Sequence, residues 1–217
     1  RNYKQRFANL TEFTAEAKRE IQKPERADKV NLVSSQIGEY DKAFDTVVDY
    51  MQERNRIVNE RLDPNGLAMR EAMTRVMESA YRDQDPEAAF YAARVQESLL
   101  LARLYAAKYL ATNEQADADR AHKELDENVT TRFQDLDERV ENPERRRLLA
   151  DFERAQQAYS TALDDINRII NQRNDVITNQ LDRIGPVVAD TTEDVKLSVQ
   201  ADQDTLGPQV REHNEKT

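Results

Sequence analysis

Apolar residues recur every three or four positions along most of the chain, which is the spacing of one face of an α-helix. The longest stripe follows Pro24, a residue type that is tolerated at the start of a helix. It runs through Val30, Val33, Ile37, Tyr40, Phe44, Val47, Met51, Arg54, Ile57 and Arg61, and resumes through Met69, Met73, Val76 and Ala80. Alternating intervals of three and four are typical of the seam of a helix bundle. The pattern therefore predicts one long helix that stops before Asp83.

Similar stripes predict four more helices, at Arg1–Gln22, Pro86–Thr112, Ala121–Val140 and from Pro143 to about Gln200. Pro64 and Gly66 interrupt the first long helix, and Gly185-Pro186 interrupts the second at the matching place. We expect a kink at each of these positions and not a reversal of the chain. The polar segment Asn113–Asp119 predicts a joint between two short helices.

The sequence contains one stretch twice. Asn142–Gly185 repeats Lys23–Gly66 at a constant interval of 119 residues, so that Tyr159 matches Tyr40 and Arg173 matches Arg54. The match extends without gaps from Asn9 to Asp85, which indicates an internal duplication. Residues 86–119 have no counterpart before Arg1, so we expect the first copy to lack its first short helix.

The helix lengths predict an all-α architecture. At 1.5 Å per residue each long helix is about 80 Å and each short one about 40 Å, so two short helices match one long helix. We expect two four-helix-bundle modules stacked end to end, sharing the two long helices. One module takes approximately residues 1–54 with 114–173, and the other 55–113 with 174–217. The second module lacks a fourth helix, whose place an unseen helix or a partner fills. Tandem three-helix repeats are the alternative.

Composition supports long amphipathic helices and narrows the function. The chain is 34% charged, with only 4 Gly among 217 residues, and its charges of both signs interleave with the apolar period. A net charge of −10 argues against a nucleic-acid or anionic-membrane surface. The absence of cysteine excludes disulfides and thiolate metal sites and is compatible with an oxidising compartment. No signal peptide or run of ~20 apolar residues is present.

Three segments in this order resemble the helical bimodular sensor domain of bacterial methyl-accepting chemotaxis receptors and some sensor kinases: Leu99–Arg120, Asn142–Leu163 and Asp194–Glu215. The resemblance implies that residues 1–217 form a single periplasmic sensor domain of an inner-membrane protein that works as a homodimer. It implies a small organic acid as the ligand, bound between helices of a module. Residues 1–54 with 114–173 would then be the distal module, and 55–113 with 174–217 the membrane-proximal one.

Arg103 is the first candidate for ligand binding. The family pocket uses an arginine in a motif that Ala102-Arg103-Leu104 and Tyr109-Leu110 match. Leucine and alanine neighbours place Arg103 at or near the bundle core, where a guanidinium needs a partner and a carboxylate ligand offers bidentate geometry. Alternatively, Arg103 extends to the rim of the bundle or pairs with Glu97 or Asp194.

Other polar residues also fall on or beside core stripes. Arg54 and Arg173 lie near the middle of the long helices, where they either frame a ligand or face the carboxylates of Asn113–Asp119 as a layer that fixes register. Gln96, Gln180 and Thr191 could orient a ligand, although such residues usually hydrogen-bond one another or water.

No catalytic or metal-binding pattern is present in the sequence. The two histidines, His122 and His213, are far apart and have no Glu-x-x-His pairing, so we expect no metal and no cofactor. Asp83–Asp85 and Asp202–Asp204 resemble part of a calcium loop but lack its Gly and distant Glu, and we interpret them as solvated helix ends. The prediction is a sensor domain and not an enzyme; the alternative is a structural or protein-binding bundle, for example one that senses a periplasmic binding protein without a small ligand.

Overall fold

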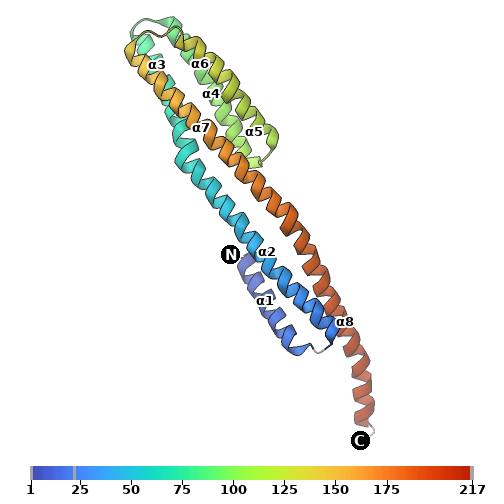
Figure 1. Cartoon of the computed structure of the whole chain (residues 1–217). Helices are drawn as coiled ribbons and strands as arrows, with labels where there is room; N and C mark the ends of the chain where they lie inside the picture. Colours follow the sequence, from blue (N-terminus) through green and yellow to red (C-terminus); the bar gives the residue numbers. More distant parts are fainter. Residues whose placement is uncertain (1, 22, 216–217) are drawn as a thin grey trace. The chain divides into compact units, whose positions relative to one another are not determined.

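The computed structural model describes residues 2–21 and 23–215, with side-chain surroundings for 4–19, 21 and 23–206. Every regular element in these ranges is helical (Figure 1), which confirms the all-α prediction. The elements are α1 (Asn2–Glu20), α2 (Pro24–Ile57), η1 (Val58–Leu62), α3 (Asp63–Arg82), α4 (Pro86–Thr112), α5 (Gln115–His122), η2 (Lys123–Val129), α6 (Thr130–Asp137), α7 (Pro143–Val176), η3 (Ile177–Leu181) and α8 (Asp182–Glu215). None of these helices is long and apolar enough to cross a bilayer within the residues searched.

The first long helix continues through Pro64 by a π-helical turn. The amide of Asp63 donates to the carbonyl of Val58, five residues earlier, and Pro64 then lies in the first turn of α3. A proline inside a continuous helix removes one backbone hydrogen bond, and the π-helical turn lies directly before the position where that bond is missing. The helix passes without a reversal from α2 through η1 to α3.

The bounds of the elements repeat at the interval seen in the sequence. Helix α7 spans Pro143–Val176 and α2 spans Pro24–Ile57, and the π-helical turns at Ile177–Leu181 and Val58–Leu62 follow them directly. Each pair of bounds differs by 119 residues. The same interval relates residues and elements, which supports the internal duplication.

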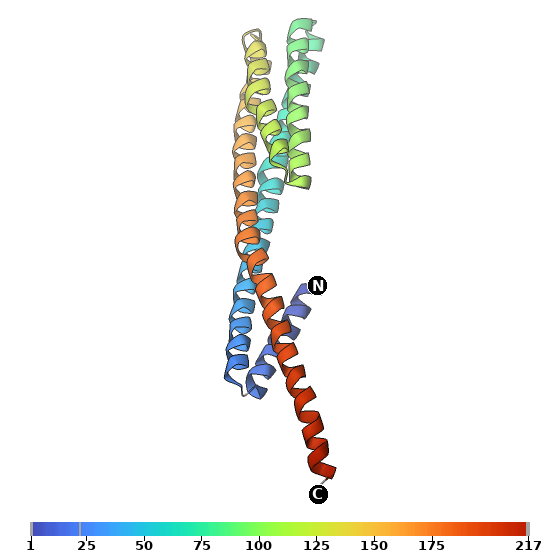
Figure 2. The same cartoon turned by 90° about the vertical axis from the view of Figure 1, so that its right-hand side faces the viewer.

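The contacts divide the chain into two compact units: unit 1, residues 1–49 with 173–217, and unit 2, residues 50–172. In unit 2, α3, α4, the run α5–η2–α6 and the first part of α7 lie alongside one another in both views (Figure 1, Figure 2). Their inward positions form one apolar core, whose largest fully buried members are Leu62, Met69, Met73, Leu99, Tyr109, Leu125, Leu136, Leu149, Phe152, Leu163, Ile166 and Ile170. Unit 2 is therefore a bundle of four helical rods.

The segment predicted as a joint reverses the chain instead. Asn113 adopts a left-handed conformation (φ 59°) after the last turn of α4, and α5 begins two residues later at Gln115. A left-handed residue at this position ends a helix and turns the backbone. Helix α4 consequently packs against α5, η2 and α6 in the same unit. The prediction that 86–112 and 121–140 belong to different modules is wrong for this reason.

Unit 1 contains α1, the first part of α2, the end of α7, η3 and α8. Arg26 binds Asp202 and Lys29 binds Asp194, so α2 and α8 run antiparallel here. This pairs the first part of one long helix with the second part of the other. The predicted grouping of residues 1–54 with 114–173 is therefore not observed. Asp202–Asp204 also lies inside α8, not at a helix end as predicted.

Candidate functional site

Arg103 lies where three helices of unit 2 come together. It follows the buried Ala102 on α4, and its own side chain is half-buried. A Cβ added to Gly66 of α3 would lie 3.0 Å from Arg103 Nε and 3.0 Å from Cε2 of Tyr159, which belongs to α7. The glycine therefore makes room for the guanidinium and the phenol ring side by side.

Tyr159 supplies the buried wall of this site. The residue is only 3% exposed. Burial raises the pKa of Tyr159 to about 12, the nearby Arg103 guanidinium opposes that rise, and Asp63 adds to it. The phenol is therefore protonated at physiological pH, and its hydroxyl remains a hydrogen-bond donor.

The two partners predicted for Arg103 in a purely structural role are bound to other cations. Glu97 pairs with Arg132 at 2.7 Å, and Asp194 pairs with Lys29 at 2.8 Å. Within the described part of the chain, no hydrogen bond or ion pair joins the Arg103 guanidinium to another residue. A half-buried guanidinium in this state has donors available for a carboxylate.

Gln96 lies two turns before Arg103 on α4. Its Nε2 donates to Thr74 Oγ1 on α3 at 3.3 Å, so the predicted candidate is engaged in a bond between neighbouring helices. Its Oε1 is buried and accepts no hydrogen bond from the described residues. A buried acceptor of this kind needs a water or a ligand donor.

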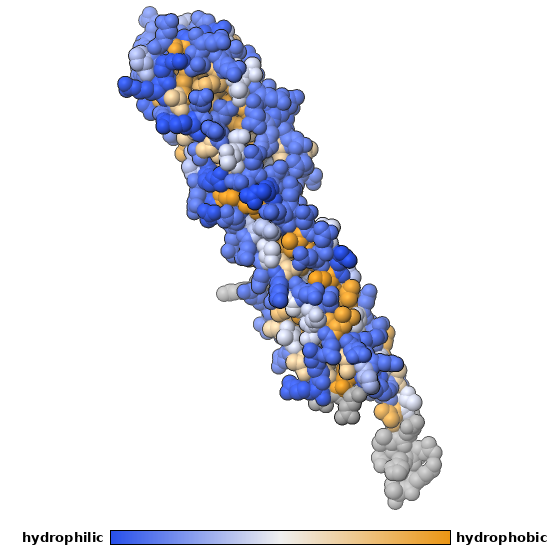
Figure 3. Space-filling view, in the orientation of Figure 1, coloured by the Kyte–Doolittle hydropathy of each residue, from blue (hydrophilic) through white to orange (hydrophobic). Residues whose placement is uncertain are grey.

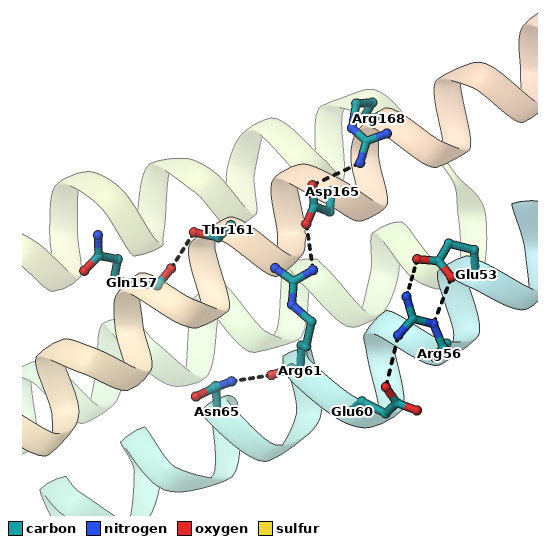
Figure 4. Close-up of polar contacts among 9 residues, drawn as sticks. All are labelled: Glu53, Arg56, Glu60, Arg61, Asn65, Gln157, Thr161, Asp165 and Arg168. Atoms are coloured by element: carbon teal, nitrogen blue, oxygen red, sulfur yellow. Dashed lines mark hydrogen bonds and ion pairs between the residues drawn. The ribbon is translucent and has the colours of Figure 1, made fainter.

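An ionic network joins η1 to α7 in unit 2 (Figure 4). Arg61 Nη1 donates to Asp165 Oδ2 at 2.7 Å, and Arg168 binds the other oxygen at 3.1 Å. The bond from Arg61, and then that from Arg168, holds the pKa of the Asp165 carboxyl below its usual range. Arg61 was recognised in the sequence only as a member of the core stripe, and nothing there identified Asp165 as its partner.

The remaining predicted site residues do not join Arg103 in one cluster within either unit. Arg54 is half-buried on α2 in unit 2. In unit 1, Arg173 donates from Nη2 to Asn174 at 2.7 Å, and Thr191 is half-buried on α8. Gln180 is exposed and lines a polar groove of about 510 Å³ together with Gln36, Glu39, Lys42, Asn179, Arg183, Ile184 and Val187.

Two arginines that sequence reasoning did not single out occupy equivalent places in the two units. Arg145 is buried and binds Asp83 at 3.0 Å and Asp85 at 3.2 Å. In unit 1 the residue 119 positions earlier, Arg26, binds Asp202 at 2.5 Å. Each follows a proline–glutamate pair at a helix start, and this repeated Pro-Glu-Arg was the available signal.

Unit 1 has a cavity at the position that corresponds to the Arg103 site. Gly185 and Tyr40 are the duplicates of Gly66 and Tyr159, and a Cβ on Gly185 would lie 3.8 Å from Tyr40 Cε2. The cavity measures about 210 Å³ and is lined by these two residues with Arg6, Phe7, Leu10, Ile37 and Val188. Hydrophobic residues also gather on the surface of this unit (Figure 3).

His122 forms a small cluster with carboxylates in unit 2. Its ring nitrogens lie 3.2 Å from Asp126 and 3.4 Å from Asp164. No group of three or more histidine or acidic side chains is arranged to hold a metal ion among the residues whose placement is described; the side chain of His213 lies outside them.

Neither protein-family models nor curated proteins provide a match to this chain.

Proposed function

We propose that this chain is the extracytoplasmic sensor domain of a homodimeric transmembrane chemoreceptor and binds a small organic acid. One observation carries the proposal: the half-buried Arg103 guanidinium beside Gly66 and Tyr159, without an ion-pair partner among the described residues. Periplasmic placement and anchoring in the inner membrane follow from the family resemblance of the sequence.

The chemistry of the site favours a carboxylate ligand. A guanidinium presents parallel N–H donors that match the two oxygens of a carboxylate. The buried Tyr159 shields one side of the half-buried guanidinium from water, which strengthens such a pair. The net charge of −10 repels a carboxylate ligand only weakly at this site, because the acidic charges are spread over the surface and screened by salt, whereas the Arg103 charge is close to the ligand.

The site joins two helices that a ligand would move relative to each other. Arg103 belongs to α4, and Tyr159 belongs to α7, which continues through η3 into α8. A ligand held by both side chains stabilises one spacing of α4 and α7. Such a ligand shifts the helix equilibrium only as far as its affinities for the two spacings differ.

The duplication also supports a four-helix module for unit 1. In unit 2, α4 covers Met69 and Met73, which are fully buried. Their counterparts in unit 1, Val188 and Thr192, are only half-buried. Apolar grooves remain beside them, one of about 360 Å³ that includes Phe13, Ala17, Ile21, Val195 and Val199. We propose that an amphipathic helix with the inward spacing of α4 completes this bundle.

Titration calorimetry against mono- and dicarboxylic acids, amino acids and amines tests the proposal. An acid at about 100 times its dissociation constant adds about 2.7 kcal/mol to the free energy of unfolding. Arg103→Ala should abolish both the heat of binding and this stabilisation. Arg94→Ala is the matched control, because Arg94 is an exposed arginine of the same helix.

Two results would count against this site. An acid that binds Arg103→Ala as tightly as the original chain places the ligand elsewhere, with the groove around Gln180 as the next location to test. Absence of binding by every compound in the panel removes the small-molecule proposal.

A protein-binding bundle is the second candidate function. Tyr81 is 84% exposed and Phe90 is 56% exposed, and both line a groove of about 870 Å³ at the turn from α3 to α4. Exposed aromatic residues of this kind are frequent in protein interfaces. If the panel gives no ligand, this groove is the surface to examine first.

A further inference from the structure

Helix α4 is apolar on two opposite faces. The inner face carries the buried Ala92, Val95, Leu99, Ala102, Ala106 and Tyr109. The outer face carries Phe90, Ala93, Glu97, Leu100, Leu104 and Ala107, and all six are exposed. Phe90, Leu100 and Leu104 are 56%, 47% and 51% exposed. A helix that is apolar on both faces is usually covered on both.

The outer residues follow a coiled-coil seam. Their intervals are three, four, three, four and three, which is the heptad spacing of positions that face a second helix. Unit 2 already contains four helical rods around its core, so its own bundle leaves no further helix for this face. The spacing therefore fits a helix from another molecule.

We propose that the outer face of α4 is the dimer interface and that its occupant is α4 of a second copy. A two-fold axis places the same residues on both sides, so a seam that is apolar along its length complements itself. Within the proposed receptor the two copies run parallel, and Leu100 and Leu104 each meet their counterparts. Only the parallel direction rests on the proposed function; the self-pairing rests on the seam alone.

The seam carries one charge, which opposes the pairing unless it is neutralised within each chain. Glu97 is its single ionised member, and in a parallel dimer it faces its own counterpart. Each Glu97 carboxylate is bound by Arg132 at 2.7 Å and by Arg94 at 3.5 Å within its own chain, which reduces the repulsion. One polar layer in an apolar seam fixes the register of two helices at some expense of affinity.

The length of the seam limits the affinity expected for the dimer. Residues 90–107 span about 26 Å of helix. One helix face of this length buries less than the roughly 800 Å² per partner of a standard interface. The dimer should therefore be weak and reversible in dilute solution, with a dissociation constant in the micromolar range or above, and tighter when both copies share a membrane.

Sedimentation of the whole chain over a range of concentrations measures the association. Leu104→Glu should weaken the dimer at least tenfold, because a charge replaces an apolar contact at the seam. Glu97→Leu should strengthen it, since the polar layer is removed. Leu197→Glu in unit 1 is the matched control, because Leu197 is a leucine of similar exposure (54%). Circular dichroism confirms that each variant is folded.

Cysteine cross-linking shows whether the two α4 helices run parallel or antiparallel. The chain contains no native cysteine that could interfere. Under mild oxidation, Leu100→Cys and Leu104→Cys should each form a covalent dimer, whereas Leu197→Cys should not. Cross-linking only in a mixture of Leu100→Cys with Glu97→Cys would show an antiparallel pair and would separate the interface from the receptor proposal. Sedimentation as a monomer at all concentrations with no cross-link, or association unaffected by Leu104→Glu, overturns the inference.

Discussion

The contact between α3, α4 and α7 at Gly66 can be tested by adding one methyl group. Gly66→Ala places a Cβ 3.0 Å from Arg103 Nε and 3.0 Å from Tyr159 Cε2. These distances are shorter than normal carbon contacts, so at least one neighbour must move. The Tyr159 ring is buried and has little freedom, and the half-buried Arg103 side chain therefore yields more easily.

Two opposing effects set the change in the free energy of unfolding that Gly66→Ala should cause. Replacing glycine by alanine inside a helix stabilises the folded state by about 1 kcal/mol. Forcing an extra methyl into a packed site costs about 1–3 kcal/mol. Gly66→Ala should therefore lower the free energy of unfolding by about 0–2 kcal/mol. Gly38→Ala is the control, because nothing lies within 4 Å of its added Cβ. It should raise the free energy by about 1 kcal/mol.

Urea denaturation followed by circular dichroism measures both variants, and calorimetry distinguishes the transitions of the two units. The free energies should differ by about 1–3 kcal/mol, with Gly38→Ala the more stable. Gly66→Ala should also weaken acid binding, because the guanidinium is displaced. If Gly66→Ala stabilises the chain as much as Gly38→Ala does, then α3, α4 and α7 do not pack as closely around Gly66 as described here.

Three further substitutions test individual interactions by urea denaturation. Arg61 and then Arg168 lower the pKa of Asp165, so this carboxylate stabilises the fold above about pH 3.9 and loses its effect as pH falls through the lowered pKa. Asp165→Asn should therefore cost about 0.5–1 kcal/mol at pH 7 and progressively less as the pH falls below the usual pKa of aspartate. Because burial raises the pKa of Tyr159 to about 12, its neutral phenol stabilises the fold below about pH 10, and this effect is lost as pH rises to about 12. Tyr159→Phe should therefore show a shallower loss of stability over that interval. Arg145→Ala should cost about 2 kcal/mol, whereas the exposed Arg154→Ala should change stability by less than about 0.5 kcal/mol.

The helices themselves were largely readable from the sequence. Helix α4 begins and ends where predicted, since Pro86 opens it and the Asp85 side chain accepts a hydrogen bond from the Ala88 amide at 3.0 Å. The topology depended on Asn113, whose left-handed backbone turns a polar joint into a reversal. A single φ angle of this kind leaves no periodic trace, so the pairing of helices could not be predicted from spacing.

Of the candidate site, only the position of Arg103 near the core could be predicted from the sequence. The apolar neighbours of Arg103 indicated a position near the core, and the structure finds it half-buried. That Gly66 and Tyr159 meet it depends on how α3 and α7 pack beside α4, which one sequence does not specify. The same holds for Asp165, because an exposed-looking aspartate on a helix gives no indication of the arginine across from it.

Two of the three π-helical turns bear on how the duplication arose. A π-turn holds one residue more than an α-turn between its bonded groups, which is what inserting a single residue into a helix produces. Val58–Leu62 and Ile177–Leu181 are related by 119 residues. On the proposed duplication, this insertion came first and was then copied. The turn at Lys123–Val129 corresponds to residues 4–10, which lie in the α-helical α1. This third turn therefore distinguishes the two copies.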